Sequence, residues 1–372
     1  MVIKNALLGL GMALTAVLLP AALASANTYD ILELPAAPTK MADKAPIFAI
    51  KKFGDRYFAV GDRGHIIYSD DVGKTWTQAE HVPVRSTLLD IDFAPDNELE
   101  GWAVGHEGVI LHTSDGGKTW ELQYDGLRYG EEGLAYYTKL AEENPDNELY
   151  DFMIGEMEFA ISQGADKPFF RVNAHNDKFV HAAGAYGMLM ATFDGGKTWV
   201  HRLESAENEN FNHYFDFSPL PEPGKFFMSG EAGLFLIGDV RDYDIANRNA
   251  RRVHSVPWEG SFFASVDAAD GAIVLGGLRG RMFRTNDEGQ TWTVVEKPPT
   301  SAIVSELRLQ DGTLVATGVA GEFLVSKDNG QSFTLDPASG TVGPVFDMAE
   351  GDDHSLLVAG PKGIKTVTLA KY

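Results

Sequence analysis

Acidic side chains that recur in one short motif are the first candidates for chemistry in this chain. The motif is an octapeptide such as SDDVGKTW (69–76) or TFDGGKTW (192–199), and its third residue is Asp71, Asp115, Asp194, Asp287 or Asp328. A carboxylate can serve as a general acid, a general base or a metal ligand. Here, however, Ser or Thr comes first, Gly fifth and an aromatic residue eighth, a composition typical of a tight turn in which the aspartate accepts backbone N–H groups. We therefore predict an Asp-box hairpin at each copy and a structural role for its aspartate.

A second motif, Gly-x-x-Gly, gives the number of structural units. Five copies precede an Asp box and two occur without one, and their first residues are Gly61, Gly105, Gly184, Gly230, Gly277, Gly318 and Gly360. Apart from one gap of 79 residues, these glycines are 41–47 residues apart, which is the length of a four-stranded propeller blade. The sequence thus predicts an all-β fold over residues 27–372, a seven-bladed β-propeller of four-stranded antiparallel blades.

The strands of each blade can be placed around these turns. In the first unit, residues 46–53 are predicted to form the inner strand, the glycine turn joins the second and third strands, and the Asp box leads to the outer strand. The last unit ends soon after its third strand. We predict that residues 28–34, TYDILEL, supply the missing strand and close the ring by pairing with the last blade.

The first 26 residues have the features of an export signal. Lys4 precedes an apolar stretch, and Ala24-Ser25-Ala26 is a small-x-small cleavage signal. We predict a signal peptide over residues 1–26 and a periplasmic or otherwise exported protein, the alternative being an uncleaved membrane anchor. The chain has no Cys and a formal net charge of −22, which excludes disulfides and argues against nucleic acid as a partner. We expect the protein to be a monomer on its own.

The one long gap in the repeat contains a segment of different character. Residues 125–166, between the second and third units, carry eleven acids and only two bases. Apolar residues there recur at helical spacing, as in Tyr150, Met153, Met157 and Ile161. We predict an acidic helical insertion, a hairpin of two helices with a break at Asn144-Pro145. It would act as a lid or docking element, or would simply pack its apolar stripe on the propeller.

Propeller geometry places the insertion on the same face as the glycine turns, opposite the Asp boxes. Polar, charged and aromatic residues of these turns therefore surround one mouth of the central channel, although each of them could also be an ordinary solvated turn residue. The binding residues that we predict on this face are Arg63, His106, Glu107, Tyr186, Glu231, Arg279, Arg281 and Lys362. The three arginines would bind carboxylates or acidic loops, and Tyr186 would be an aromatic contact.

The combination of Gly-x-x-Gly, a short strand and T-x-D-G-G-K-T-W, repeated around a ring behind an export signal, resembles the photosystem II stability and assembly factors and their relatives in non-photosynthetic bacteria. The resemblance covers residues 46–370 except the insertion. It implies a non-enzymatic protein that binds a membrane protein or a subunit of an envelope complex, such as a transporter. It also implies an arginine-rich binding patch, for which Arg63, Arg279 and Arg281 stand in comparable turns. The acidic insertion is not a hallmark of that family, which indicates a different partner.

An enzyme is the alternative, because Asp boxes also occur in sialidases and other glycosidases. A sialidase needs an arginine before the first box, and residues 27–55 contain none. A glycosidase with two catalytic carboxylates would have to draw on Glu107, Glu231 and Glu322, which nothing in the sequence marks as a pair. A glycan or small-molecule ligand is therefore the second hypothesis. The pairs His106/His112 and His175/His181 lack a strong zinc spacing, and no phosphate loop is present, so we expect no metal and no cofactor.

Overall fold

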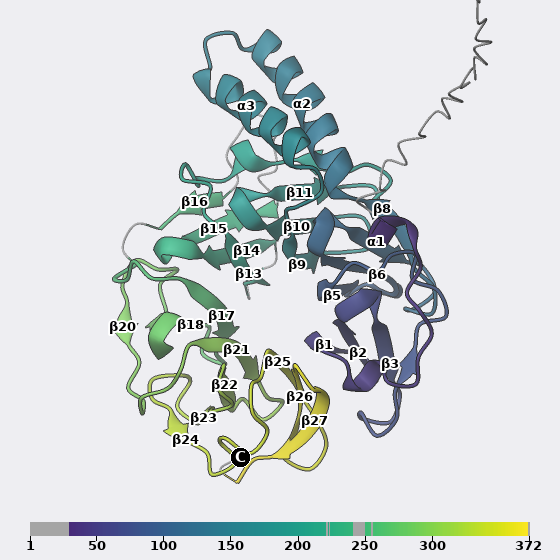
Figure 1. Ribbon diagram of the computed structural model, residues 1–372. Helices are drawn as coiled ribbons and strands as arrows, with labels where there is room; N and C mark the ends of the chain where they lie inside the picture. The colour runs from purple at the N-terminus through teal and green to yellow at the C-terminus, as the bar shows by residue number, and fades with distance from the viewer. Residues whose placement is uncertain (1–29, 221, 223, 241–249, 254–255, 371–372) are drawn as a thin grey trace, which may run out of the picture.

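The chain forms a ring of seven antiparallel sheets around a central channel (Figure 1). The computed structural model describes residues 30–220, 222, 224–240, 250–253 and 256–370. Within these residues six sheets have four strands and the last has three. The propeller expected from the two repeats is thereby confirmed. The signal peptide expected over residues 1–26 lies outside the described residues.

The strands follow one another from the inner to the outer edge of each blade. Blades 1 to 3 consist of β1 (Ile47–Phe53), β2 (Arg56–Gly61), β3 (Ile66–Ser69) and β4 (Thr77–Gln78); β5 (Leu88–Ala94), β6 (Asn97–Gly105), β7 (Ile110–Thr113) and β8 (Glu121–Tyr124); and β9 (Phe169–Ala174), β10 (Val180–Gly184), β11 (Leu189–Thr192) and β12 (Val200–His201). Blades 4 and 5 consist of β13 (Tyr214–Pro219), β14 (Lys225–Gly230), β15 (Phe235–Asp239) and β16 (Ala250–Arg252); and β17 (Phe262–Asp267), β18 (Ile273–Gly277), β19 (Met282–Thr285) and β20 (Thr293–Val294). Blades 6 and 7 consist of β21 (Ile303–Arg308), β22 (Leu314–Gly318), β23 (Phe323–Ser326) and β24 (Thr334–Leu335); and β25 (Asp347–Glu350), β26 (Ser355–Gly360) and β27 (Gly363–Thr368).

The Asp boxes form the turns between the third and outer strands. Both carboxylate oxygens of each box aspartate accept hydrogen bonds within the turn. In the third box, Asp194 accepts hydrogen bonds from the hydroxyl of Thr192 (2.9 Å) and from the backbone N–H (2.9 Å) and hydroxyl (2.8 Å) of Thr198. Gly196 has a φ of 84°, a conformation that favours glycine, and donates to the Thr192 hydroxyl. The same bonds recur at Asp71, Asp115, Asp287 and Asp328. These acids are structural parts of the turns.

The N-terminal segment does not close the ring as a strand. The expectation that residues 28–34 pair with the last blade is wrong for the described part of the segment, because Asp30–Glu33 form a short helix, α1; residues 28 and 29 lie outside the described residues. Leu32 is buried in the core cluster that contains Val82 and Val84, and the N–H of Arg85 donates to the carbonyl of Ile31 (2.7 Å). The segment therefore packs beside the link between blades 1 and 2. There the side chain of Leu32 is buried, and the carbonyl of Ile31 accepts its hydrogen bond from Arg85 and not from a strand of blade 7.

The ring closes instead through packing and one half-buried aspartate, Asp347. A 3-10 turn, η1 (Ala42–Lys44), lies along β27, and its Ala42 joins the core between blades 7 and 1. Asp347 at the start of β25 accepts a hydrogen bond from the N–H of Ile50 in blade 1 (2.9 Å) and one from the hydroxyl of Ser305 in blade 6 (2.7 Å). One carboxylate thus connects three neighbouring blades at the seam.

The segment between blades 2 and 3 is the predicted helical hairpin. It consists of α2 (Gly126–Glu143), capped by Asp125, and α3 (Glu148–Gln163), and it stands out from the ring (Figure 1). Met153 and Met157 are buried, as expected, but Ile161 remains 44 % exposed although it packs against Gly130 of α2. Among the described residues, no helix is long and apolar enough to span a membrane.

Candidate functional site

The glycine turns share one face of the ring, and five of them hold a residue other than glycine in a left-handed conformation. In five of the seven turns the residue before the second glycine has a left-handed backbone, with φ between 52° and 59°: Arg63, Glu107, Tyr186, Ala232 and Arg279. These residues lie in the 3-10 turns η2 (Asp62–Gly64), η3 (His106–Gly108), η4 (Ala185–Gly187), η6 (Glu231–Gly233) and η8 (Leu278–Gly280). A left-handed conformation is uncommon for residues other than glycine, and such positions concentrate at functional sites.

In six of the seven turns the first glycine is required by a close contact with a backbone carbonyl oxygen, whereas Gly318 of blade 6 faces the side chains of Glu322 and Ser301. A Cβ at Gly61 would lie 2.1 Å from the carbonyl oxygen of Pro46, and one at Gly105 would lie 2.1 Å from that of Thr87. No side chain fits at that distance. In these blades the turn is therefore held tightly against the start of the inner strand.

Basic residues of the predicted site line hollows in two places on this face. Arg63, whose side chain is 79 % exposed, lies with His65 and Arg85 at a hollow of about 400 Å³ beside blade 1. Arg279, Arg281 and Lys297 lie with Trp258 at a hollow of about 480 Å³ beside blade 5. The guanidinium of Arg281 stands 5.6 Å from the centre of the Trp258 ring. Burial, together with the charge of Arg281, lowers the pKa of Lys297. The hollow at blade 5 therefore favours an anionic ligand.

Tyr186 and Glu231 are brought together by a residue that the sequence did not single out. The ring of His213 lies 4.8 Å from that of Tyr186, and His213 Nε2 is 3.9 Å from a carboxylate oxygen of Glu231. Lys167 lies 5.8 Å from the centre of the Tyr186 ring and 5.4 Å from that of Phe159 in the insertion. A chain of aromatic and basic groups thus connects α3 with the turns of blades 3 and 4.

The remaining predicted residues are spread around the ring. His106 and Glu107 lie beside the start of the insertion, where the carbonyl oxygen of Glu107 would be 2.8 Å from a Cβ at Gly126. Lys362 lines a small hollow of about 60 Å³ with Lys365 at the turn of blade 7. The eight predicted residues therefore surround one face and do not meet at one point. This arrangement suits recognition of an extended surface.

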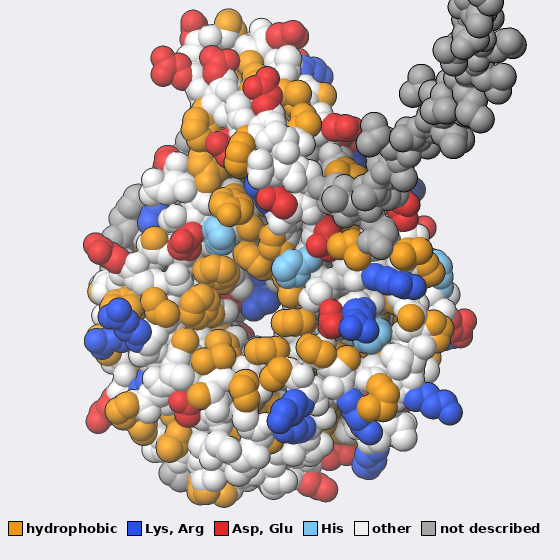
Figure 2. All heavy atoms as spheres, in the orientation of Figure 1, with side chains coloured by type: hydrophobic (Ala, Val, Ile, Leu, Met, Phe, Trp, Pro, Cys, Tyr) orange, Lys and Arg blue, Asp and Glu red, His pale blue; other side chains and the backbone are white. Residues whose placement is uncertain are grey.

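The residues predicted from the sequence do not include a ring of apolar side chains at the channel mouth. In six blades an apolar residue follows the first position of the inner strand, at a register shift typical of a β-bulge, and in blade 7 Phe346 directly precedes the inner strand: these residues are Phe48, Leu89, Phe170, Phe215, Phe263, Val304 and Phe346. The rings of Phe48 and Phe346 stack 5.3 Å apart, and Phe215 contacts both Phe170 (5.6 Å) and Phe263 (5.2 Å). Hydrophobic side chains surround the central opening in Figure 2. The signal in the sequence was a recurrent apolar pair at the start of each inner strand.

Of the three acids considered for glycoside cleavage, Glu231 and Glu322 accept hydrogen bonds from the protein, whereas Oε2 of Glu107 is buried without a hydrogen-bond partner among the described residues. Glu322 accepts hydrogen bonds from the N–H and the hydroxyl of Ser301 (both 2.8 Å), which outweigh the effect of burial and lower its pKa. Glu231 accepts a bond from the N–H of His213 (3.3 Å). A general acid needs a raised pKa, which Glu322 does not have.

The histidine pairs also have protein partners. His175 Nε2 lies 3.0 Å from His181 Nδ1 within a cluster of phenylalanine rings. His112 lies against Glu100 (2.7 Å) and Glu121 (3.2 Å), and is not beside His106. In the part of the chain that the structure describes, no group of three potential ligands could hold a metal ion.

The insertion is fixed to blade 3 by a buried acid. Glu204, in the 3-10 turn η5 (Leu203–Ser205), accepts hydrogen bonds from the hydroxyls of Tyr136 (3.2 Å) and Tyr137 (2.9 Å) of α2. Burial raises the pKa of Glu204, and the nearby guanidinium of Arg202 opposes that effect. A Cβ at Gly133 would lie 2.3 Å from the sulfur of Met157, so a glycine is needed where α2 meets α3. These contacts hold the insertion against blade 3.

Comparisons with known proteins agree with this architecture. The sequence profile of a family described as photosynthesis system II assembly factor YCF48 matches residues 78–148 and 160–336. Among solved structures, "YCF48 bound to D1 peptide" is 16 % identical, with a TM-score of 0.60 over 88 % of this chain and 94 % of that one. YCF48 from Cyanidioschyzon merolae is also 16 % identical, with a TM-score of 0.60 over 90 % and 98 %.

Other propellers are similar in fold as well. The WD40 propeller domain of Doa1 is 10 % identical, with a TM-score of 0.57 over 92 % of this chain and 96 % of that one. No curated protein matches the sequence. These structural similarities show the fold alone, whereas the profile match covers more than half of the chain. By its sequence, therefore, this chain belongs to the family of photosynthesis system II assembly factor YCF48.

Proposed function

We propose that this protein is an exported, non-enzymatic scaffold that binds a segment of a membrane protein while the complex containing that protein is assembled. The supporting observation is the hollow at blade 5. Arg279, Arg281 and Lys297 line this hollow together with the indole of Trp258. Arginine presents a planar fork of donors that matches a carboxylate, and it stacks on aromatic rings. An acidic segment or a chain terminus of the partner is the ligand that this hollow would bind.

Membership of the family supports the same proposal. A relative has been solved as "YCF48 bound to D1 peptide", so a member of this fold binds a peptide. The face of this chain offers an apolar mouth with basic hollows on its rim, which fits a polypeptide better than a small molecule. We further propose that the export signal is cleaved after Ala26 and that the protein acts in the periplasm, on an envelope complex such as a transporter.

Crosslinking in the native envelope tests this proposal. Tagged protein would be crosslinked in intact cells of its own host, and crosslinked peptides would be identified by mass spectrometry. We expect reproducible crosslinks from the glycine-turn face to one membrane protein, and we expect Arg279→Glu with Arg281→Glu to remove them. Arg251→Glu is the matched control, because Arg251 is an exposed arginine on the outer strand β16. Crosslinks that survive the double substitution, or turnover of a glycoside by the purified protein, would contradict the proposal.

The place of the protein in the cell is tested separately. Osmotic-shock fractionation should release the protein, and N-terminal sequencing of the released form should begin at Asn27. A protein that stays with the membrane and keeps residues 1–26 would show instead that the leader is an uncleaved anchor.

A further inference from the structure

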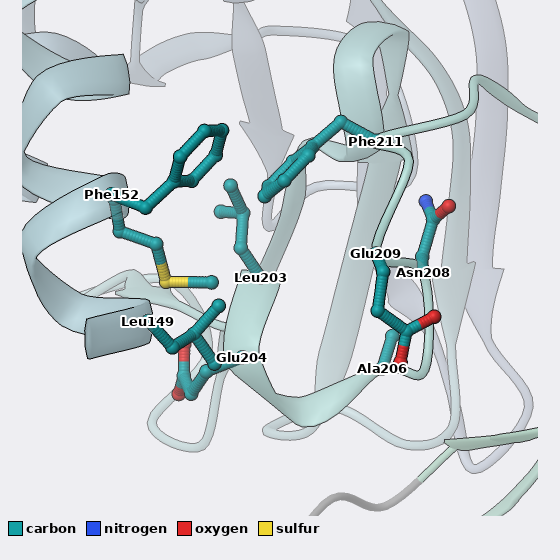
Figure 3. Close-up of a pocket in the computed structure, with 9 residues that line it drawn as sticks. Leu149, Phe152, Leu203, Glu204, Ala206, Asn208, Glu209 and Phe211 are labelled. Carbon is teal, nitrogen blue, oxygen red and sulfur yellow. The ribbon is translucent and has the colours of Figure 1, made fainter. Parts of the chain in front are cut away.

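The pocket between the insertion and the link from blade 3 to blade 4 is lined by groups that already have partners in the chain. Figure 3 shows the rings of Phe152 and Phe211 on its two sides, and their centres are 5.2 Å apart. Phe152 is 50 % exposed, but this ring contact lies within the chain. Glu204 at the same pocket accepts hydrogen bonds from Tyr136 and Tyr137. These residues hold the insertion in place and define no ligand.

The outer edge of blade 7, in contrast, has backbone groups without partners. Among the described residues this blade has three strands in the order β25-β26-β27, so β27 forms its outer edge (Figure 1). The strand has six residues, whereas the third strands of the other blades have four or five. A long strand at the edge of a sheet presents a row of backbone donors and acceptors to which another strand can bind.

The other blades show which backbone groups a fourth strand would use. In blade 1 the N–H of Ala79, directly after the outer strand, donates to the carbonyl of Ile66, the first residue of the third strand (2.9 Å). In β27 the residue that corresponds to Ile66 by its pairing with the second strand is Ile364. Within the described residues its carbonyl accepts no such bond. The carbonyls that accept this bond in blades 3 to 6 belong to Leu189, Phe235, Met282 and Phe323.

The open edge continues along β27. Backbone groups alternate between the two sides of a strand, so those of Thr366 and Thr368 face the same side as those of Ile364. Both threonines are exposed, whereas the third strands of the other blades contain no exposed residue. The turn η1 approaches β27 at its first residue, where a Cβ at Gly363 would lie 2.0 Å from the carbonyl oxygen of Asp43. The edge is therefore open from residue 364 to residue 368.

The charges beside this edge define the chemistry of a segment that would bind there. Residues 40–44 and 361–365, which meet where β27 begins, contain four lysines and one acid. Lys44 and Lys362 are exposed. This local excess of positive charge stands out in a chain whose net charge is −22. A segment with Asp or Glu beside these lysines is favoured, whereas a second copy of β27 would bring lysines together.

We propose that β27 binds an extended segment of the partner protein, which adds to blade 7 as its fourth strand. This inference rests on the proposed function and names a second contact with the same partner. The outer strands of the other blades run antiparallel to their third strands and pair over two or three residues each. A short segment therefore suffices, and its C-terminal end lies beside Lys44 and Lys362. Its sequence has β-branched or aromatic residues followed by an acid.

Peptide selection on a variant without the basic hollow of blade 5 tests the inference. Phage displaying random dodecapeptides would be selected on the mature chain, residues 27–372, carrying Arg279→Glu and Arg281→Glu, and in parallel on the parent. We expect the variant to enrich β-branched or aromatic residues followed by Asp or Glu. Thr366→Pro removes an N–H on the open side of β27, a position where an edge strand tolerates proline. It should weaken binding of the synthetic peptide at least about fivefold, as expected when one backbone hydrogen bond is lost.

Two controls separate strand pairing from other effects. Thr366→Ser keeps the N–H and should bind the peptide like the parent. Leu335→Pro places a proline on the outer strand β24 of blade 6 and should leave binding unchanged. Leu335 is 40 % exposed, and its N–H faces away from β23 because that of the next residue, Asp336, donates to Phe323 of β23. Thermal denaturation would verify folding, and Thr368→Pro replaces Thr366→Pro if that variant does not fold.

A charge exchange tests the orientation of the bound segment. Lys44→Glu with Lys362→Glu changes two exposed positions at the start of β27. Selection on this variant should replace the acid at the C-terminal end of the peptides by Lys or Arg. An unchanged preference for an acid there would overturn the inference.

The possible results distinguish this inference from the proposed function. Peptides that bind the parent through Arg279 and Arg281 occupy the glycine-turn face. If these are the only peptides enriched, or if binding survives both Thr366→Pro and Thr368→Pro, the inference is overturned and the proposed function stands. A dimer that Thr366→Pro dissociates in analytical ultracentrifugation would show that a second copy occupies the edge, which also overturns the inference. If neither protein enriches peptides above the level of an unrelated immobilised protein, both fail.

Discussion

The hydroxyl of Tyr137 donates a 2.9 Å hydrogen bond to Glu204, and both groups are buried at the junction of the insertion with blade 3. Tyr136 donates to the other carboxylate oxygen of the same residue. A buried carboxylate is costly unless hydrogen-bond donors surround it. The position of the insertion therefore depends on these two hydroxyls.

Removing one hydroxyl should loosen the insertion. We expect Tyr137→Phe to lower the free energy of unfolding by about 1–3 kcal/mol, the usual cost of leaving a buried acceptor without its donor. Urea denaturation measures the change. Tyr150→Phe is the control, because Tyr150 is also partly buried in the insertion and makes no side-chain hydrogen bond within the described residues. Equal losses for the two variants would contradict the anchoring role of Tyr137.

Two histidines of blade 3, the half-buried His175 and the buried His201, should make the protein sensitive to acid. Burial lowers the pKa of His175 to about 4 and that of His201 to about 3. An unfolded histidine has a pKa of about 6.5, so below that pH protons bind the unfolded chain more strongly and favour unfolding. The stabilising contribution is complete above pH 6.5 and is lost as the pH falls toward 4, by up to about 1.4 kcal/mol per pH unit for each histidine.

Comparison with a variant isolates this contribution. Burial raises the pKa of Asp92 to about 6, which gives a pH dependence of opposite sign in part of the same range. Urea denaturation of the parent and of His175→Phe should therefore be compared at each pH from 4 to 8. The variant should lose less stability between pH 6.5 and 4. Parallel curves for the two proteins would show that His175 is not the acid-sensitive group.

Two glutamates of blade 6 should affect stability in opposite directions. Both carboxylate oxygens of Glu306 are buried without a hydrogen-bond partner among the described residues, and burial raises its pKa well above 4.5. Because the folded-state pKa is raised, stability falls as the pH rises from 4.5 toward the folded pKa. Glu306→Gln removes this penalty and should stabilise the protein at pH 7 by on the order of 1 kcal/mol or more.

Glu322 provides the matched comparison. Its pKa is lowered despite burial, because Ser301 donates two hydrogen bonds to it. A lowered pKa in the folded state stabilises the protein above the unfolded value of about 4.3, and this contribution is lost as the pH falls through the folded pKa. Glu322→Gln should therefore destabilise the protein at pH 7. Thermal denaturation at pH 4 and pH 7 measures the change in stability of both variants. A change in the same direction for Glu306→Gln and Glu322→Gln at pH 7 would refute the opposite pKa shifts assigned to the two glutamates.

Substitution of an Asp-box aspartate should affect folding but not binding. Asp194→Asn replaces one acceptor oxygen by a donor and removes a bond from Thr198. We expect a loss of about 1 kcal/mol in unfolding free energy, with unchanged affinity for peptides selected on the opposite face. Calorimetric melting and peptide titration of the same preparation give both quantities. A loss of affinity without a loss of stability would mean that the box takes part in binding.

The sequence predicted the repeating parts of the molecule well and the unique parts poorly. The boxes and glycine turns could be recognised because Asp194 and Gly61 each meet a local requirement that few other residues satisfy. The helix at Asp30–Glu33 could not be foreseen, because the pattern of TYDILEL fits a strand and only the burial of Leu32 against blades 1 and 2 decides the outcome. The same holds for Phe152, since helical spacing identifies an apolar side chain but not whether the fold covers it.

The corrected position of the N-terminal segment changes what a truncation should do. A protein that begins at residue 37 loses the buried side chain of Leu32, the bonds from Arg85 to the carbonyls of Ile31 and Pro35, and the bond from the N–H of Ala36 to the carbonyl of Val82. We expect a loss of about 3–5 kcal/mol, from burial of one leucine and three hydrogen bonds. Unfolding should remain a single cooperative transition, because no blade loses a strand. Circular dichroism during heating tests this, and separate melting of blade 7 would show that the segment closes the ring after all.

The left-handed turn residues have a consequence for how this protein can vary. Arg, Glu, Tyr, Ala and Arg occupy the same conformation in five blades, and the neighbouring glycines meet the steric demands of the turn. The backbone cost of such a position depends little on which unbranched side chain is present. Mutation can therefore exchange these five side chains while the ring stays intact, much as antibody loops change on a constant framework. A library randomised at these positions alone would be a practical source of new binding proteins on this scaffold.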